Sequence, residues 1–179
     1  MRLHIATDHA GLEFSHLLQE HLRNRGHELV DHGPTAYDPL DDYPSFCIAA
    51  ARAVAEDWRA GTPSLGIVLG GSGNGEQMAA NKVRGVRAAL VWNEQTARLA
   101  REHNNANVVA IGARQHTREE AIALVEAFLA EPFSDEERHV RRIRQLAEYE
   151  RDGAIGGLLA PEGPAGPTPV VLGGAGERA

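Results

Sequence analysis

One stretch of the chain combines glycines with a carboxylate in a pattern that could support catalysis. In Leu65–Lys82, LGIVLGGSGNGEQMAANK, an apolar run leads into four closely spaced glycines and then Glu76. A strand that passes through a glycine turn into a helix directs several backbone N–H groups at one point, with the helix dipole behind them. Such a point suits a phosphate or a developing oxyanion, and Glu76 could act as a base beside it. The alternative is an ordinary tight turn in which Gly73 and Gly75 have positive φ and Glu76 is a first-turn acid.

Two further groups offer side chains for acid–base chemistry. Asp8-His9 follows an apolar run and provides a carboxylate and an imidazole, although Asp8 could merely cap a helix and His9 bond a loop. His103 and Asn104 lie at the predicted end of a helix. A cationic histidine and an asparagine are also favoured there without any function.

Arginines close to element ends could bind an anion. Arg114 follows a predicted strand, and Arg138 and Arg142 share one face of a predicted helix, where they could bind a phosphate or form a solvated basic face. A metal site is weakly supported, because the spacing of five between His16 and His21 does not suit one helical face. A dinucleotide site is also weakly supported, because the glycines lack the GxGxxG spacing.

Alternating strands and helices must position these residues. The patterns predict strands over Arg2–Thr7, His27–Asp31, Leu65–Leu69, Arg87–Trp92 and Asn107–Ile111, and helices over 12–25, 45–59, 76–82, 94–103, 117–129 and 134–151. Two of these helices carry a capping-box pattern, Thr117-x-x-Glu120 and Ser134-x-x-Glu137. The alternation favours the α/β class, with a doubly wound five-stranded parallel sheet in a Rossmann-like or flavodoxin-like three-layer sandwich and a C-terminal helix. Ligands bind beyond the carboxyl ends of such strands, so Asp8-His9, the glycine turn and Gly112–Arg114 should lie together.

Composition narrows the class of protein further. The 179 residues, 42% of them hydrophobic, suit one domain with a substantial core, and the net charge of −7 argues against general nucleic-acid binding. With no long apolar run or signal-peptide pattern, we expect no membrane association and a cytoplasmic location. The single cysteine, Cys47, excludes an internal disulfide and is expected in the core. We expect the domain to cover residues 1–153 and a Gly/Pro-rich flexible tail to cover 154–179.

Eight motifs occur in the order typical of one enzyme family. They are Asp8-His-Ala-Gly11, Asp42-Tyr-Pro44, Gly71-Ser-Gly-Asn-Gly75, Ala79-Ala-Asn-Lys82, Gly85-Val-Arg-Ala-Ala89, His103-Asn104 with Ala106-Asn107, Gly112-Ala-Arg114 and Arg138-His-x-x-Arg142. Through them, residues 1 to 150 resemble type B ribose-5-phosphate isomerase, within a wider group that includes galactose-6-phosphate isomerase subunits. The tail lies outside the resemblance.

The resemblance implies interconversion of ribose 5-phosphate and ribulose 5-phosphate, in the non-oxidative branch of the pentose phosphate pathway. The reaction would pass through a cis-enediol without metal or cofactor. Glu76 would move the proton between C2 and C1, since Gly70 stands where many members have a cysteine base. An ordinary carboxylate pKa would suffice if the enediolate is stabilised. Ser72 and the turn residues would stabilise the enediolate and bind the substrate, the turn residues being Gly71, Gly73, Asn74 and Gly75.

The resemblance also assigns ring opening, phosphate binding and assembly. Asp8 and His103 would help open the furanose ring, with Asn104 holding a hydroxyl. The phosphate would be bound by basic side chains, namely His9, Arg114, Arg138 and Arg142. Family sites lie between two subunits, so a homodimer or homotetramer is implied. The alternatives are an isomerase of a six-carbon or four-carbon sugar phosphate, a non-catalytic sugar-phosphate-binding subunit, and a flavodoxin-like module that binds FMN or a nucleotide.

Overall fold

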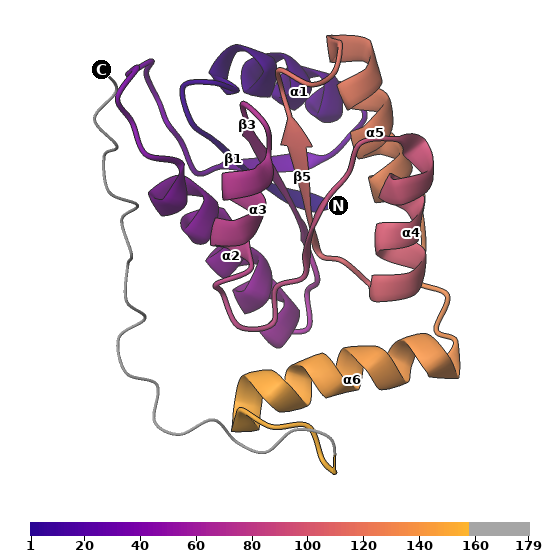
Figure 1. Ribbon diagram of the computed structural model, residues 1–179. Helices are drawn as coiled ribbons and strands as arrows, with labels where there is room; N and C mark the ends of the chain where they lie inside the picture. The colour runs from indigo at the N-terminus through magenta and orange to yellow at the C-terminus, as the bar shows by residue number, and fades with distance from the viewer. Residues whose placement is uncertain (158–179) are drawn as a thin grey trace, which may run out of the picture. The chain divides into compact units, whose positions relative to one another are not determined.

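The computed structural model describes residues 1–157, and the chain divides into two units, residues 1–143 and 144–179. The first unit is built on a sheet of five strands, β1 (Arg2–Thr7), β2 (Glu28–Asp31), β3 (Leu65–Gly70), β4 (Ala88–Leu90) and β5 (Val108–Gly112). All strand pairs are parallel, in the order β2-β1-β3-β5-β4. Figure 1 labels the three central strands, β1, β3 and β5. The predicted α/β class and five-stranded parallel sheet are confirmed.

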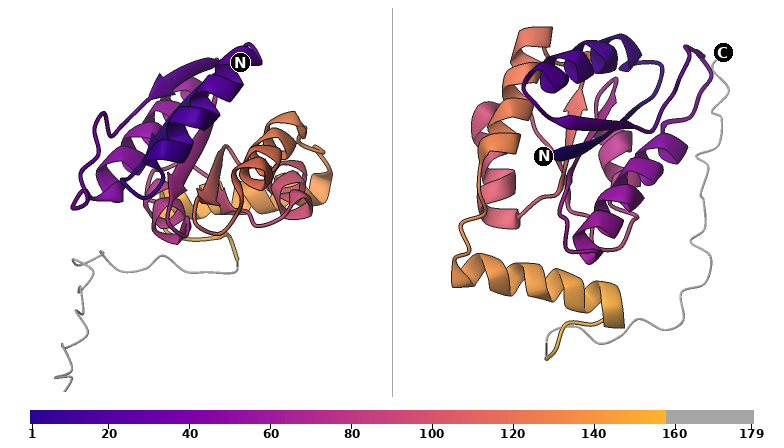
Figure 2. Two further views of the ribbon diagram at one scale, coloured as in Figure 1. Left: turned by 90° about the horizontal axis from the view of Figure 1, so that it is seen from above. Right: turned by 180° about the vertical axis from the view of Figure 1, so that it is seen from behind.

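Helices cover both faces of this sheet (Figures 1 and 2). One face packs against α1 (Leu12–Asn24), α4 (Glu94–Asn104) and α5 (Arg118–Ala130), and the other against α2 (Tyr43–Arg59) and α3 (Asn74–Ala80). Successive residues of β3 alternate between the two apolar clusters, with Ile67 in the first and Val68 in the second. Because both faces are covered, β3 is buried along its whole length, as its unalternating apolar sequence predicts.

The last helix, α6 (Glu137–Asp152), begins in the first unit and ends in the second. In the second unit, the N–H of Gly156 donates to Oε1 of Glu148 at 2.6 Å. The predicted tail, 154–179, lies outside the described residues from 158 onward, so its boundary stays a prediction.

The start of α6 corrects one prediction. The helix begins at Glu137, not at Ser134, because Asp135 has a φ of 55° and cannot belong to a right-handed helix. The predicted capping box at Ser134 is therefore wrong, and the Ser134 hydroxyl instead lies 2.7 Å from Nδ1 of His139. The box at Thr117 and Glu120 is confirmed.

Other boundaries shift by a few residues. β4 has three residues instead of the predicted six, at the outer edge of the sheet where it pairs with β5 alone. α2 begins at Tyr43, two residues earlier than predicted, since Pro44 fits the first turn of a helix. α3 begins at Asn74, within the glycine turn.

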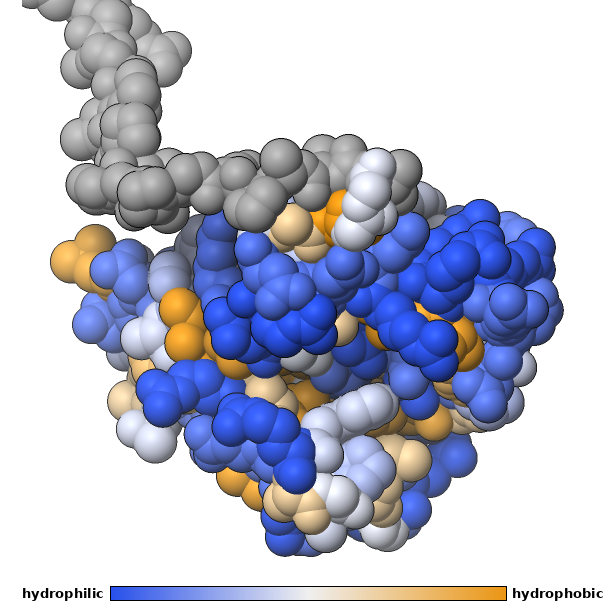
Figure 3. Space-filling view, turned by 90° about the horizontal axis from the view of Figure 1, so that it is seen from below, coloured by the Kyte–Doolittle hydropathy of each residue, from blue (hydrophilic) through white to orange (hydrophobic). Residues whose placement is uncertain are grey.

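Charged residues make up an ordinary share of the chain, 24%. Figure 3 shows one face, on which hydrophilic residues predominate and hydrophobic residues occur in small separate patches. None of the helices in residues 1–157 combines the length and the apolar character needed to cross a membrane. Cys47 is fully buried in the cluster between α2 and the sheet, as predicted.

Candidate active site

The carboxyl ends of β1, β3 and β5 bring three predicted groups together. The register pairs Thr7 of β1 with Leu69 of β3, and Gly70 of β3 with Gly112 of β5. The helices that follow β1 and β3 lie on opposite faces, which opens a crevice between these strands. Asp8-His9, the glycine turn and Gly112–Arg114 therefore lie along one end of the sheet, as predicted, and we call it the carboxyl end.

The Glu76 carboxylate is folded back over the end of β3. Only 4% of Glu76 is exposed, although it lies in the first turn of α3. A Cβ atom added to Gly70 would overlap both carboxylate oxygens of Glu76. Gly70 is thus required for space, since only a residue without a side chain leaves room for this carboxylate.

Burial changes the acidity of this carboxylate. Removal from water raises the pKa of Glu76, and the nearby Asp8 raises it further, while backbone N–H groups of Glu76 itself and Gly73 act in the opposite direction. An ordinary carboxylate pKa would suffice for the reaction, but in this structure burial raises the pKa of Glu76. A higher pKa makes Glu76 a stronger base once it is ionised.

The glycine turn is shaped by close contacts as well as by backbone conformation. Gly73 has a φ of 81° and precedes α3, as the sequence predicts. Gly75 does not have positive φ; a Cβ atom there would lie 2.5 Å from Cζ of Tyr43, so the glycine allows the tyrosine ring to pack against the turn. The Ser72 hydroxyl accepts from the backbone N–H of Asn74 at 3.3 Å and from its side chain at 3.2 Å. The Ser72 hydroxyl proton can then point toward a ligand.

A cavity of about 360 Å³ lies beside this turn. Its lining residues include Ser72 and Asn74 of the turn, and the others are Leu90, Val91, Trp92, Gly112, Gln115 and His116. The size is appropriate for a small ligand. Asp8 and Glu76 are not among the lining residues, so the cavity is adjacent to the carboxylates and does not enclose them.

Arg114 brings a positive charge to the carboxyl end. Its backbone N–H donates to the carbonyl of Gly71 at 3.1 Å. A Cβ atom on Gly71 would lie 3.6 Å from Nη1 of Arg114 and 3.8 Å from Cβ of Ala10. The guanidinium therefore lies over Gly71, close to the loop that follows β1, where it could bind an anion.

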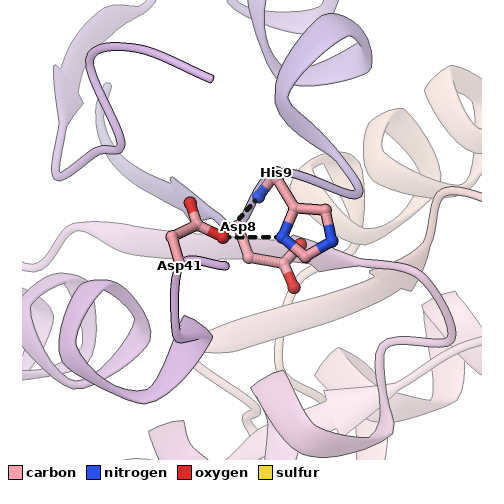
Figure 4. Close-up of side chains that lie close together, drawn as sticks. All are labelled: Asp8, His9 and Asp41. Carbon is pink, nitrogen blue, oxygen red and sulfur yellow. Dashed lines mark hydrogen bonds and ion pairs between the residues drawn. The ribbon is translucent and has the colours of Figure 1, made fainter. Parts of the chain in front are cut away.

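His9 is held by Asp41, an acidic residue outside the sequence-predicted site. Its ring Nδ1 and its backbone N–H lie 2.7 and 3.0 Å from Oδ1 of Asp41 (Figure 4). Asp8 is held locally, with its Oδ1 accepting from the N–H of Ala10 at 2.9 Å. No local pattern predicts the contact, because Asp41 lies 32 residues away in the polar loop before α2.

Asp8, His9 and Asp41 are also a group of described residues whose oxygen and nitrogen atoms come within 4.8 Å of one another, as in a metal site. The 2.7 Å contact between His9 Nδ1 and Asp41 Oδ1 requires a proton between them. A metal ion bound to both atoms would have to replace that hydrogen bond. The arrangement fits an oriented histidine better than a preformed metal site.

His103 and Asn104 do not lie at the carboxyl end of the sheet. They end α4, which leaves the carboxyl end of β4 and has 11 residues, a length of about 16 Å. The chain then returns to β5, and the N–H of Asn107 donates to the carbonyl of Arg87, just before β4 begins. In Figure 1, β5 and α4 run in opposite directions. His103 and Asn104 are therefore at the amino end of the sheet, away from Asp8 and Glu76.

The first turns of α6 join this second group. The His139 ring lies 4.3 Å from the His103 ring, centroid to centroid, and burial is the main cause that lowers the pKa of His139. Arg138 and Arg142 flank His139 and are exposed; Arg138 forms an ion pair with Glu136 at 2.8 Å. The predicted site residues thus form two groups in one chain, at opposite ends of the sheet.

Comparison with known proteins places the chain in a family. The family model for ribose/galactose isomerases matches residues 3–146. The chain belongs to the ribose/galactose isomerase family. The sequence is 58% identical over 151 residues to ribose-5-phosphate isomerase B of Mycobacterium tuberculosis, covering 84% of this chain and 91% of the relative.

Solved structures of family members have the same fold. Ribose-5-phosphate isomerase B from Mycoplasma genitalium, solved with bound ribulose-5-phosphate, matches with a TM-score of 0.78 and 43% identity, over 84% of this chain and 96% of that chain.

The galactose-6-phosphate isomerase subunit LacB of Clostridium acetobutylicum is 43% identical over 115 residues, or 64% of this chain and 63% of the relative. The resemblance noted in the motifs is thus confirmed.

This chain carries Gly70 and Glu76 together at the end of β3. The strand–turn–helix pattern identified Glu76 and the resemblance to the family identified Gly70, but neither gave the reason that they occur together. The structure gives that reason, since the carboxylate occupies the space that a side chain at position 70 would need.

Proposed function

We propose that this chain interconverts ribose 5-phosphate and ribulose 5-phosphate through a cis-enediol, with Glu76 as the base. The observation that carries the proposal is the buried Glu76 carboxylate, held over Gly70 beside Asp8. Relatives that cover nearly the same length carry the name ribose-5-phosphate isomerase B, and one was solved with bound ribulose-5-phosphate.

The proton transfer requires a strong base and stabilisation of the enediolate. The carbon-bound proton at C2 is a very weak acid, so a carboxylate with a raised pKa is better suited than an exposed one. The Ser72 hydroxyl can donate to the developing oxyanion while its oxygen accepts from Asn74. Glu76 would take the proton from C2 and return it to C1.

Ring opening and phosphate binding require both groups of residues. We assign the opening of the furanose ring to Asp8 and His103, and the contact with a sugar hydroxyl to Asn104. The phosphate would contact basic residues of both groups, namely His9, Arg114, Arg138 and Arg142.

Two copies of the chain can bring these groups together. One chain places His103 and Arg138 at the amino end of its sheet, far from its own Glu76. We therefore propose a homodimer, or a homotetramer built from such dimers, in which the amino-end group of one subunit completes the carboxyl-end group of another. We further propose that the enzyme acts in the pentose phosphate pathway in the cytoplasm.

The reaction can be tested directly in deuterated water with a chelator present. We expect purified protein to convert ribose 5-phosphate to ribulose 5-phosphate with deuterium incorporated at C1 or C2, and the Glu76→Gln variant to lose at least about 100-fold in kcat. Activity only on galactose 6-phosphate would reassign the substrate to the six-carbon class named by the LacB relative. Equal activity of the variant and the wild type would refute Glu76 as the base.

A further inference from the structure

The contact between His9 and Asp41 points to a role for a residue outside the assigned site. A single oxygen, Oδ1 of Asp41, accepts from both the ring Nδ1 and the backbone N–H of His9, at 2.7 and 3.0 Å (Figure 4). The Asp41 side chain is 9% exposed, whereas that of His9 is 26% exposed. The aspartate side chain is therefore more buried than the histidine side chain. The accessible part of the His9 ring is the part that does not contact Asp41.

Among the described residues, only His9 donates hydrogen bonds to the Asp41 carboxylate. Its second oxygen, Oδ2, is buried and has no hydrogen-bond partner in the described part of the chain. Burial of a carboxylate is costly unless hydrogen bonds compensate. Both hydrogen bonds to Asp41 Oδ1 come from His9. We therefore infer that the buried carboxylate serves to orient this histidine.

Two hydrogen bonds within the loop before α2 hold Asp41 in position. The Asp38 side chain accepts from the N–H of Leu40 at 2.9 Å, and the Asp38 carbonyl accepts from the N–H of Asp41 at 3.2 Å. The ring of Tyr37, from the same loop, meets the His9 ring edge-on, with centroids 6.2 Å apart. The histidine ring is thus fixed by a hydrogen bond at Nδ1 and an aromatic contact.

We propose that Asp41 is a positioning residue that keeps Nδ1 of His9 protonated and directs Nε2 toward the substrate phosphate. With Nδ1–H donated to Asp41, Nε2 is the ring nitrogen left for a ligand. In the imidazolium form, Nε2–H donates to a phosphate oxygen while Nδ1–H donates to the Asp41 carboxylate. The inference rests on the proposed function, because it takes the phosphate of the substrate as the ligand of His9.

The test compares Asp41→Ala, Asp41→Asn and a control, Asp42→Asn. Asp42 is the exposed neighbouring carboxylate and forms no side-chain cap with α2. Two readouts are used: the tautomer of His9 from ring 15N chemical shifts, and KM and kcat for ribose 5-phosphate together with inhibition by inorganic phosphate. The NMR spectra also show whether each variant is folded.

We expect Asp41→Ala to lose the Nδ1–H tautomer and to raise both KM and the phosphate inhibition constant by about ten-fold, with kcat nearly unchanged. Asp41→Asn, whose amide oxygen can still accept both N–H groups, should keep the tautomer and show a smaller rise. The control should match the wild type. An unchanged tautomer and KM in folded Asp41→Ala, or a loss confined to kcat, would overturn the proposal.

The experiment distinguishes failure of the Asp41 proposal from failure of the proposed isomerase function. If the wild type does not isomerise ribose 5-phosphate, binding of inorganic phosphate, followed by NMR, replaces the kinetic readout. Weaker phosphate binding and a changed tautomer in Asp41→Ala would then support the positioning role without the isomerase activity, and unchanged binding would overturn it.

Discussion

At the scale of single residues, the proposed chemistry depends on a carboxylate and the space that holds it. The pattern of an apolar run, a glycine turn and a helix identified Glu76, and the resemblance to the family identified Gly70. The depth of burial of Glu76 and the contribution of Asp41 could not be predicted. Both depend on contacts between distant parts of the chain, and no local periodicity reports such contacts.

The raised pKa of Glu76 predicts the pH dependence of the reaction. The base must be ionised, so kcat/KM should fall as the pH drops through the pKa of Glu76 in the free enzyme. Because burial and Asp8 raise this pKa, the acid limb should lie above the usual glutamate pKa of about 4.3. A pH–rate profile with ribose 5-phosphate measures it, and a limb at or below the usual value would contradict the burial argument.

The same shift predicts an effect on stability. A carboxyl group whose pKa is raised on folding stabilises the protein below its ordinary pKa, and this contribution is lost as the pH rises through the folded-state value. Glu76→Gln removes the buried charge at every pH. We expect its Tm to exceed that of the wild type by a few degrees near pH 8, with the difference shrinking toward about pH 4. Thermal unfolding at both pH values tests this, and a lower Tm of the variant at pH 8 would contradict it.

The pairing of Gly70 with Glu76 predicts non-additive mutations. Gly70→Ala should displace the carboxylate and lower kcat by at least about 100-fold in a folded protein, because the added Cβ occupies its place. The control is the double variant Gly70→Ala/Glu76→Gln. It should be no less active than Glu76→Gln alone if Gly70 acts only through Glu76. Additive losses would show an independent role of Gly70.

At the scale of elements, the sequence predicted every strand and helix of the first unit, and the errors lie at their ends. Buried strands such as β3 are recognised by a continuous apolar run. The start of α6 could not be predicted, because a left-handed backbone at Asp135 interrupts a segment with good helix-forming residues. The end of a helix or strand can be decided by the backbone conformation of one residue, whereas its interior is decided by the pattern of many side chains.

The capping box of α5 gives a prediction at this scale. The Thr117 hydroxyl accepts from the N–H of Glu120 at 3.2 Å, and the Glu120 carboxylate accepts from the N–H of Thr117 at 2.9 Å. Thr117→Ala should cost about 1 kcal/mol and lower Tm by about 3 °C. Activity at 25 °C should be unchanged, since neither residue belongs to the site. Thermal unfolding measures the effect, and an unchanged Tm would show that the box contributes nothing.

At the scale of the whole molecule, the proposed site needs more than one chain. Glu76 and Asp8 lie at the carboxyl end of the sheet, and His103 lies at the amino end, one length of α4 away. The sequence could predict which residues are present and on which elements they lie. The predicted parallel sheet already requires α4 to run back to the amino end of the sheet, but no local pattern predicts that His139 of α6 packs against His103 there.

Mixing two inactive variants tests this account most directly. Glu76→Gln and His103→Ala subunits, each inactive alone, are unfolded and refolded together and then assayed with ribose 5-phosphate. If the site takes Glu76 from one subunit and His103 from the other, each mixed dimer has one intact site. About a quarter of the wild-type activity should then return, since half of the randomly formed dimers are mixed. If the site lies within one chain, every site keeps one defect and no activity returns, which would contradict the two-subunit site.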